Sequence, residues 1–126
     1  MNGIKILIIE DDRDLANIYA ESFQMDGFEV KNAFDGKEGL KAALEYHPDI
    51  ILLDIMLPLM GGLEVLKALK SDPLSASVPV ILLTMVSNES IITQGFQEQA
   101  DGYIIKATFS PSQVREEVKT YLIPKG

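Results

Sequence analysis

Acidic and other polar side chains follow directly on several short apolar runs of the sequence. Glu10 and Asp11 come straight after the first run, Asp54 follows another, and Thr84 and Lys106 follow two later ones. Clustered carboxylates are the ligands that Mg²⁺ or Mn²⁺ prefers, and a lysine with a hydroxyl suits phosphoryl oxygens. If the fold brings these ends together, the pattern predicts phosphoryl transfer to a carboxylate, with Asp54 as the acceptor.

The apolar runs themselves indicate buried strands. Continuous apolar runs of this length are typical of parallel strands that are covered on both faces. They occupy residues 4–9, 50–53, 80–83 and 103–105. The segment 28–31 alternates apolar and charged residues, so it predicts a half-exposed strand at the edge of the sheet.

Helical patterns fill the stretches between these runs. Capping boxes are expected where Asp35 precedes Glu38 and where Ser110 precedes Gln113, and Pro73 ends a third helix. Alternation of strand and helix predicts an α/β fold with right-handed crossovers. We expect a doubly wound five-stranded parallel sheet of flavodoxin-like order 2-1-3-4-5, with helices on both faces.

This strand order predicts where the polar side chains meet. Ligands bind outside the carboxyl ends of parallel strands, where the winding direction reverses, and strands one and three are neighbours there. Asp54 should therefore lie beside Glu10 and Asp11. Purely structural roles are the alternatives to this prediction. Asp12 suits a helix N-cap, and Asp54 suits a turn. Lys106 suits a surface position in which its stem packs on apolar residues.

Four of these segments together resemble the receiver domain of bacterial two-component response regulators. They are ILIIEDD at residues 6–12, ILLDIMLP at 51–58, LLT at 82–84 and DGYIIK at 101–106. The resemblance runs from Lys5 to about Leu122. It implies the stand-alone, chemotaxis-type single-domain form, with residues 1–126 as one receiver domain.

The resemblance also implies the roles of the site residues. Asp54 would be the phosphorylated residue, and Asp54, Asp11 and the main-chain carbonyl of Met56 would bind Mg²⁺, with Mn²⁺ as an alternative and Glu10 helping through water. Lys106 would contact the phosphoryl group. The donor would be a phosphohistidine on a sensor histidine kinase or a phosphotransfer protein.

A conformational switch is implied as well. Thr84 would move toward the phosphoryl group and Tyr103 would turn inward, changing a protein-interaction surface built from the fourth helix, the last strand and the last helix. Such a domain is a phosphoacceptor that assists its own phosphorylation and dephosphorylation, and is not classed as an enzyme.

The sequence departs from the family pattern at four places. Ala107 follows Lys106 where the family has a cis-proline, so we expect a trans bond, because a cis bond before alanine costs ~3–4 kcal/mol. Met85 stands where a small residue is usual. Gly61 and Gln99 replace a common aspartate and glycine in two loops.

Composition limits the class of protein. The chain has 126 residues, 47% of them hydrophobic, which suits one domain with a real core. A net charge of −8 argues against nucleic acid as a direct partner, and the first apolar run is too short for a membrane span. With no cysteine, a cytoplasmic location is the expectation.

Two other functions stay open from the sequence. A receiver-like interaction adaptor that is never phosphorylated would explain Met85 and Ala107. A phosphatase of the haloacid-dehalogenase type would need a second aspartate two residues after the nucleophile, and that position is Met56.

Overall fold

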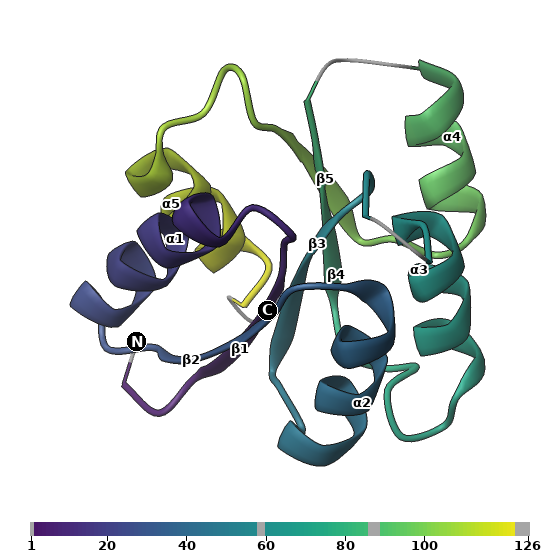
Figure 1. Ribbon diagram of the computed structural model, residues 1–126, viewed down its shortest axis with the longest axis horizontal. Helices are drawn as coiled ribbons and strands as arrows, with labels where there is room; N and C mark the ends of the chain where they lie inside the picture. The colour runs from purple at the N-terminus through teal and green to yellow at the C-terminus, as the bar shows by residue number, and fades with distance from the viewer. Residues whose placement is uncertain (1, 58–59, 86–88, 123–126) are drawn as a thin grey trace.

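A parallel sheet of five strands forms the middle layer of the molecule, with helices packed on both of its faces (Figure 1). The computed structural model describes residues 2–57, 60–85 and 89–122, so Pro58 of the ILLDIMLP segment lies outside the described residues. The strands are β1 (Lys5–Ile9), β2 (Glu29–Ala33), β3 (Ile50–Asp54), β4 (Val80–Thr84) and β5 (Gly102–Ile105). The helices are α1 (Arg13–Met25), α2 (Gly36–Tyr46), α3 (Gly62–Ser71), α4 (Glu89–Gln97) and α5 (Pro111–Thr120).

The strand order is β2-β1-β3-β4-β5, which confirms the predicted flavodoxin-like order. Every pairing is parallel, and β1 lies between β2 and β3. β3 and β4 are buried along their whole length, whereas β2 alternates between exposed and covered positions. The alternating charge pattern of β2 therefore marked the edge strand correctly.

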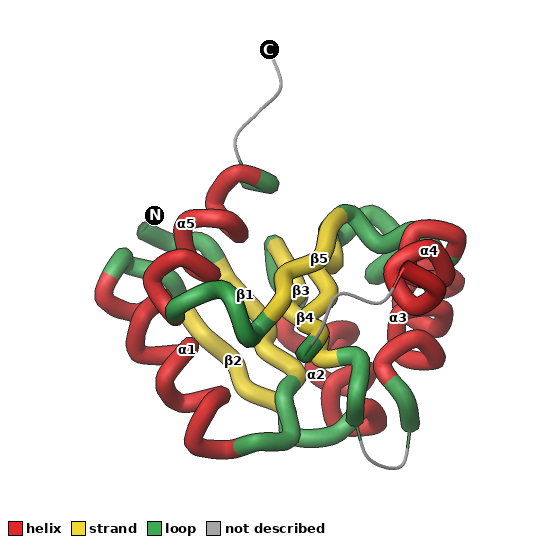
Figure 2. The backbone as a smooth tube through the Cα atoms, turned by 90° about the horizontal axis from the view of Figure 1, so that it is seen from above, coloured by secondary structure: helices red, strands yellow, loops and turns green. Residues whose placement is uncertain are grey.

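Two apolar clusters pack against the sheet, one on each face. Figure 2 shows α1 and α5 on one side of the sheet and α3 and α4 on the other. Tyr19 and Phe23 of α1 pack with Val114 and Val118 of α5 against one face. The other face is covered by α2 and α3, with α4 beside α3. Ile18 of α1, although apolar, is 47% exposed, because the helix turns this position toward solvent.

The helix starts follow the predicted caps, with one difference. Asp12 caps α1 by accepting the main-chain N–H of Leu15, and Ser110 with Gln113 forms a complete capping box at α5. Asp35 accepts the N–H of Glu38 as predicted, at 2.7 Å. The Glu38 carboxylate, however, accepts from Phe34, one residue before the cap, so the reciprocal bond of that capping box is displaced.

No helix in the described ranges is long and apolar enough to cross a membrane. The peptide bond between Lys106 and Ala107 is trans, as are all the others in the described part of the chain, which confirms that expectation.

Two glycines, Gly61 and Gly62, stand where the chain enters α3 after leaving β3. The N–H of Gly62 donates to the carbonyl of Ile55, 2.9 Å away, so the start of α3 lies directly against the end of β3. A Cβ atom at Gly62 would overlap the main chain of Asp54 and Ile55, whereas one at Gly61 would meet nothing within 4 Å. Glycine is therefore required at Gly62 for close approach and not at Gly61.

We expect Gly62→Ala to lower the free energy of unfolding by about 1–3 kcal/mol, because the main chain of β3 must shift to admit the methyl group. Gly61→Ser is the matched control. Its hydroxyl supplies the side-chain N-cap that α3 lacks, so stability should stay equal or rise by a few tenths of a kcal/mol. Urea unfolding of both variants measures the difference, and equal stabilities would contradict the close-approach argument.

Candidate functional site

Three carboxylates converge at the carboxyl end of the sheet. Glu10 and Asp11 follow β1, and Asp54 is the last residue of the neighbouring strand β3. One carboxylate oxygen from each residue lies within 4.8 Å of the others. Glu10 and Asp54 are 1% and 3% exposed, while Asp11 is open to solvent. The side chain of Asp12 caps α1 and is not part of this group, so the structural role predicted for Asp12 is the one observed.

Lys106 places a buried ammonium group between two of these carboxylates. Its Nζ donates to Glu10 Oε2 at 2.8 Å and to Asp54 Oδ2 at 3.0 Å. The main-chain N–H of Lys106 donates to the carbonyl of Thr84, which ties the end of β5 to the end of β4. The side chain is therefore not a surface lysine with a packed stem, because its charged end is buried in the site.

The other oxygen of Asp54 is also engaged. Asp54 Oδ1 accepts the main-chain N–H of Met56, 3.0 Å away. The carboxylate is thus held from one side by the chain that follows it and from the other by Lys106. The role of the Met56 carbonyl as a metal ligand stays a prediction.

Burial changes the proton affinity of this cluster. Burial, reinforced by the hydrogen bond and charge of Asp54, raises the pKa of Glu10 from 4.5 to about 7, although Lys106 acts in the opposite direction. For Lys106, burial alone would lower the pKa, but the hydrogen bond to Glu10 and the charges of both carboxylates outweigh it and raise the pKa. The pocket thus holds more negative charge than one lysine neutralises.

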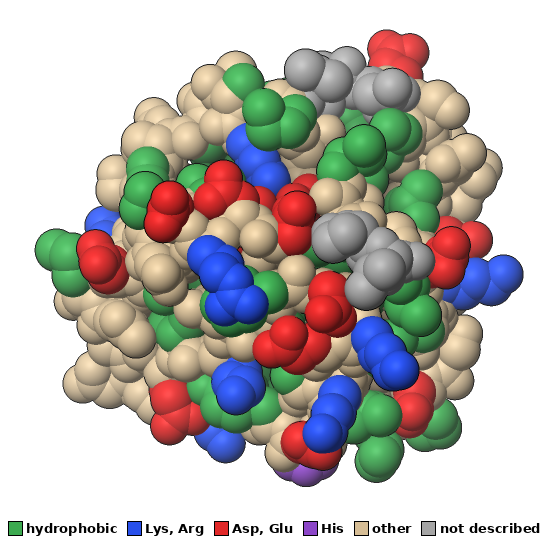
Figure 3. Space-filling model, viewed as in Figure 1, with side chains coloured by type: hydrophobic (Ala, Val, Ile, Leu, Met, Phe, Trp, Pro, Cys, Tyr) green, Lys and Arg blue, Asp and Glu red, His purple; other side chains and the backbone are tan. Residues whose placement is uncertain are grey.

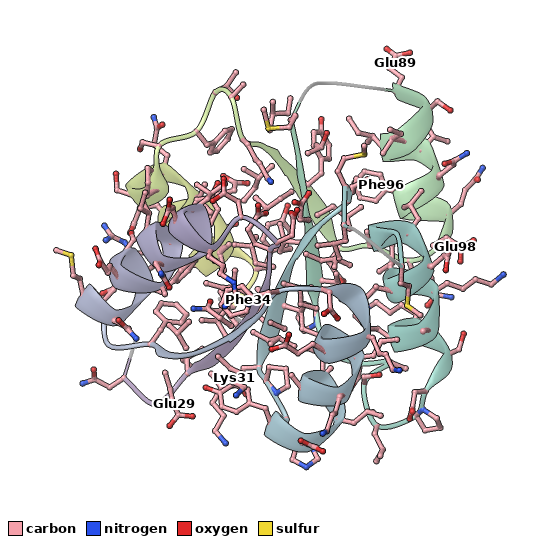
Figure 4. The ribbon with its side chains drawn as sticks, in the orientation of Figure 1. Glu29, Lys31, Phe34, Glu89, Phe96 and Glu98 are labelled. Atoms are coloured by element: carbon pink, nitrogen blue, oxygen red, sulfur yellow. The ribbon has the colours of Figure 1, made fainter. Side chains whose placement is uncertain are left out.

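The two residues expected to act as a switch occupy different environments. Thr84 ends β4 and is buried. Tyr103 lies on β5 and is 39% exposed, with its ring edge-on to Phe96 of α4 at a centroid distance of 6.1 Å. Phe96 projects from α4 toward β5 (Figure 4). Tyr103 therefore points outward, away from the carboxylates.

Two exposed methionines follow the strands that end at the site. Met56 and Met85 follow the ends of the paired strands β3 and β4, and they are 68% and 56% exposed. The departure noted at Met85 therefore leaves a large flexible side chain in solvent beside the site.

Sequence reasoning missed a contact on the opposite side. The guanidinium of Arg13, at the start of α1, lies 4.0 Å from the centre of the Phe34 ring, which follows β2. The two residues are far apart in sequence, and no spacing rule pairs them. Only the parallel pairing of β1 with β2 brings them together.

The donor set of the pocket suits a hard divalent cation. All three converging side chains offer oxygen, and the chain has no cysteine to favour a softer metal. A cation here would favour the ionised form of Glu10 against the burial and the effect of Asp54 that raise its pKa, so the residues present fit the expected metal.

Comparison with known proteins agrees with this arrangement. Residues 6–119 match the family model described as the response regulator receiver domain. The chain is similar to the chemotaxis response regulator CheY4 of Vibrio cholerae, with 26% identity, a TM-score of 0.87, and coverage of 93% of this chain and 97% of that one.

Curated relatives are longer than this chain. The DNA-binding dual master transcriptional regulator RpaA of Synechocystis is 37% identical over 81% of this chain and 42% of the relative. The alkaline phosphatase synthesis transcriptional regulatory protein PhoP of Bacillus subtilis is 36% identical over 94% and 48%. The chain thus spans about half the length of the curated relatives it matches. Together with the fold and the acidic pocket, these matches place the chain in the family of response regulator receiver domains, the signalling domains of two-component systems.

Proposed function

We propose that Asp54 accepts a phosphoryl group from a phosphohistidine on a sensor histidine kinase or a phosphotransfer protein. The observation that carries this proposal is the buried Asp54 carboxylate, which shares one pocket with Glu10, Asp11 and the Nζ of Lys106. Residues 1–126 act in this proposal as a single receiver domain in the cytoplasm.

The transfer exchanges one bond for another. A carboxylate oxygen of Asp54 forms a bond to phosphorus as the bond from phosphorus to the histidine nitrogen breaks, and the electron pair leaves with the imidazole. The carboxylate loses its negative charge on becoming an acyl phosphate. Lys106 then exchanges its contact with Asp54 Oδ2 for the phosphoryl oxygens, which carry the new charge.

Glu10, Asp11 and Asp54 would hold Mg²⁺, or Mn²⁺, together with the main-chain carbonyl of Met56. The bound cation would neutralise phosphoryl oxygens during the transfer. Glu10 contributes in its ionised form, so its raised pKa opposes metal binding at low pH.

Phosphorylation would be read out through protein contacts. Thr84 would turn toward the phosphoryl group, and Tyr103 would leave its outward position against Phe96. The face formed by α4, β5 and α5 already carries a groove of about 340 Å³, lined by Phe96, Tyr103, Phe109 and Tyr121 among others. A change at Tyr103 therefore alters the shape of a surface that a protein partner can contact.

Incubation with Mg²⁺ and phosphoramidate should add the mass of one phosphoryl group to the wild-type chain, read by intact mass spectrometry. Asp54→Asn should abolish the added mass, because an amide cannot form the acyl phosphate. Asp12→Asn is the matched control: asparagine caps a helix as well as aspartate, so labelling should persist. Labelling that survives in Asp54→Asn would refute the proposed acceptor, and no labelling of the wild type would favour the adaptor function.

The affinity for Mg²⁺ should rise from about pH 6 to about pH 8, because the raised pKa of Glu10 means that the metal must displace a proton. Without metal, folded Glu10 keeps its proton up to about pH 7 and unfolded Glu10 loses it near pH 4.5, so unfolding becomes easier as pH rises between these values. Calorimetric titration and urea unfolding measure the two effects. Glu10→Gln should flatten both pH dependences; unchanged slopes in that variant would assign them to another group.

We expect Met85→Ala to speed labelling by phosphoramidate a few-fold, since it removes a large side chain beside the pocket. The free energy of unfolding should change by less than about 0.5 kcal/mol, because Met85 is mostly exposed. Met25→Ala, at an 84% exposed residue at the end of α1, is the control for the loss of a surface methionine. An equal effect of both substitutions, or none at Met85, would show that Met85 does not limit access.

A further inference from the structure

Arg13, two residues after Asp11, is held in place by an aromatic ring. Its guanidinium lies over the face of Phe34 at 4.0 Å, within the range of a favourable cation–π contact. Arg13 is itself solvent-exposed, and Phe34 is half-buried on the connection from β2 to α2 (Figure 4). A stacked guanidinium keeps its N–H donors free at the ring edge, so the contact fixes the position of Arg13 without using up its charge.

The parallel pairing places this stack next to the carboxylates. Ile9 pairs with Ala33 across β1 and β2, and the N–H of Glu10 donates to the Ala33 carbonyl at 3.0 Å. Phe34 therefore follows the edge strand where Glu10 follows β1. Arg13 itself follows Asp11 by two residues, so the stack lies at the same end of the sheet as the carboxylates.

The guanidinium of Arg13 is available to bind an anion, whereas the ammonium of Lys106 is already paired with carboxylates. Lys106 is buried and already paired with Glu10 and Asp54 before any donor arrives. No hydrogen bond or ion pair joins the Arg13 guanidinium to another residue in the described ranges, although Asp12 and Asp14 are its sequence neighbours. Arg13 can therefore attract an incoming anion without giving up an ion pair, whereas Lys106 must release one first.

The surroundings of the pocket make this attraction important. Figure 3 shows acidic side chains gathered over the start of α1 and the end of β1, with basic side chains among them. The whole chain carries a net charge of −8. A phosphodonor with two negative charges meets more repulsion here than one with a single charge, and a fixed cation at the rim reduces that difference.

We propose that Arg13, positioned by Phe34, is a specificity-determining residue that favours dianionic acyl phosphates as small-molecule phosphodonors. This inference rests on the proposed phosphorylation of Asp54. It goes beyond it by assigning donor preference to a residue outside the group of carboxylates and Lys106.

A purely structural role is the alternative. The stack joins the first turn of α1 to the end of β2, and its loss could loosen both segments. Such loosening would slow labelling by every donor alike and would not depend on salt. Donor charge and ionic strength therefore separate the two roles.

The experiment compares labelling rates with acetyl phosphate, a dianion, and with phosphoramidate, whose protonated nitrogen leaves it less negative near neutral pH. In Arg13→Gln the acetyl phosphate rate should fall about three- to tenfold at low ionic strength, and the phosphoramidate rate less than about twofold. The difference should shrink as salt is added. Arg13→Lys should keep much of the acetyl phosphate rate, and Phe34→Leu should lose part of it, because the cation is no longer held in place.

Lys67→Gln removes the same charge from an exposed position on α3 and serves as the control; it should leave the ratio of the two rates unchanged. Thermal unfolding of each variant checks that it is folded. Equal losses with both donors, or unchanged rates in Arg13→Gln, would overturn the assignment to Arg13 while leaving Asp54 as the acceptor. Failure of both donors to label the wild type would instead refute the proposed function, and this inference with it.

Discussion

The ion pairs of Lys106 with Glu10 and Asp54 are the interaction on which the rest of the site depends. A buried carboxylate without a partner is costly, and here two of them lie at the ends of adjacent strands. One ammonium group bridges both, at 2.8 and 3.0 Å. Because one positive charge faces three converging carboxylates, the pocket keeps an excess of negative charge, which favours a divalent cation.

The sheet topology makes this arrangement available. Reversal of winding between β1 and β3 leaves their carboxyl ends uncovered by a crossover connection, and β5 brings Lys106 in beyond β4. Completely buried strands hold these ends rigidly, since β3 and β4 have no exposed residue. The close contact of Gly62 with Ile55 supports the same end of β3 from the side of α3.

Two kinds of residue follow the strands on either side of the carboxylates. Met56 and Met85 are exposed apolar side chains that follow β3 and β4. Arg13 and Phe34 lie on the side of β2 and supply a held positive charge. The pocket is thus asymmetric, and the proposed donor preference arises from this asymmetry together with the pocket's own charge.

The sequence by itself determined the strand order and the group of residues at the strand ends. Apolar runs ending in Glu10, Asp54 and Lys106 carry that information locally, because burial selects apolar residues and each run stops where the sheet meets solvent. The sequence also predicted the N-cap role of Asp12, although the local pattern alone could not decide between this role and metal binding. Only the tertiary structure decided that Ile18 and Tyr103 face outward and that Arg13 stacks on Phe34. Such contacts join segments distant in sequence, and they depend on packing across elements that no periodicity encodes.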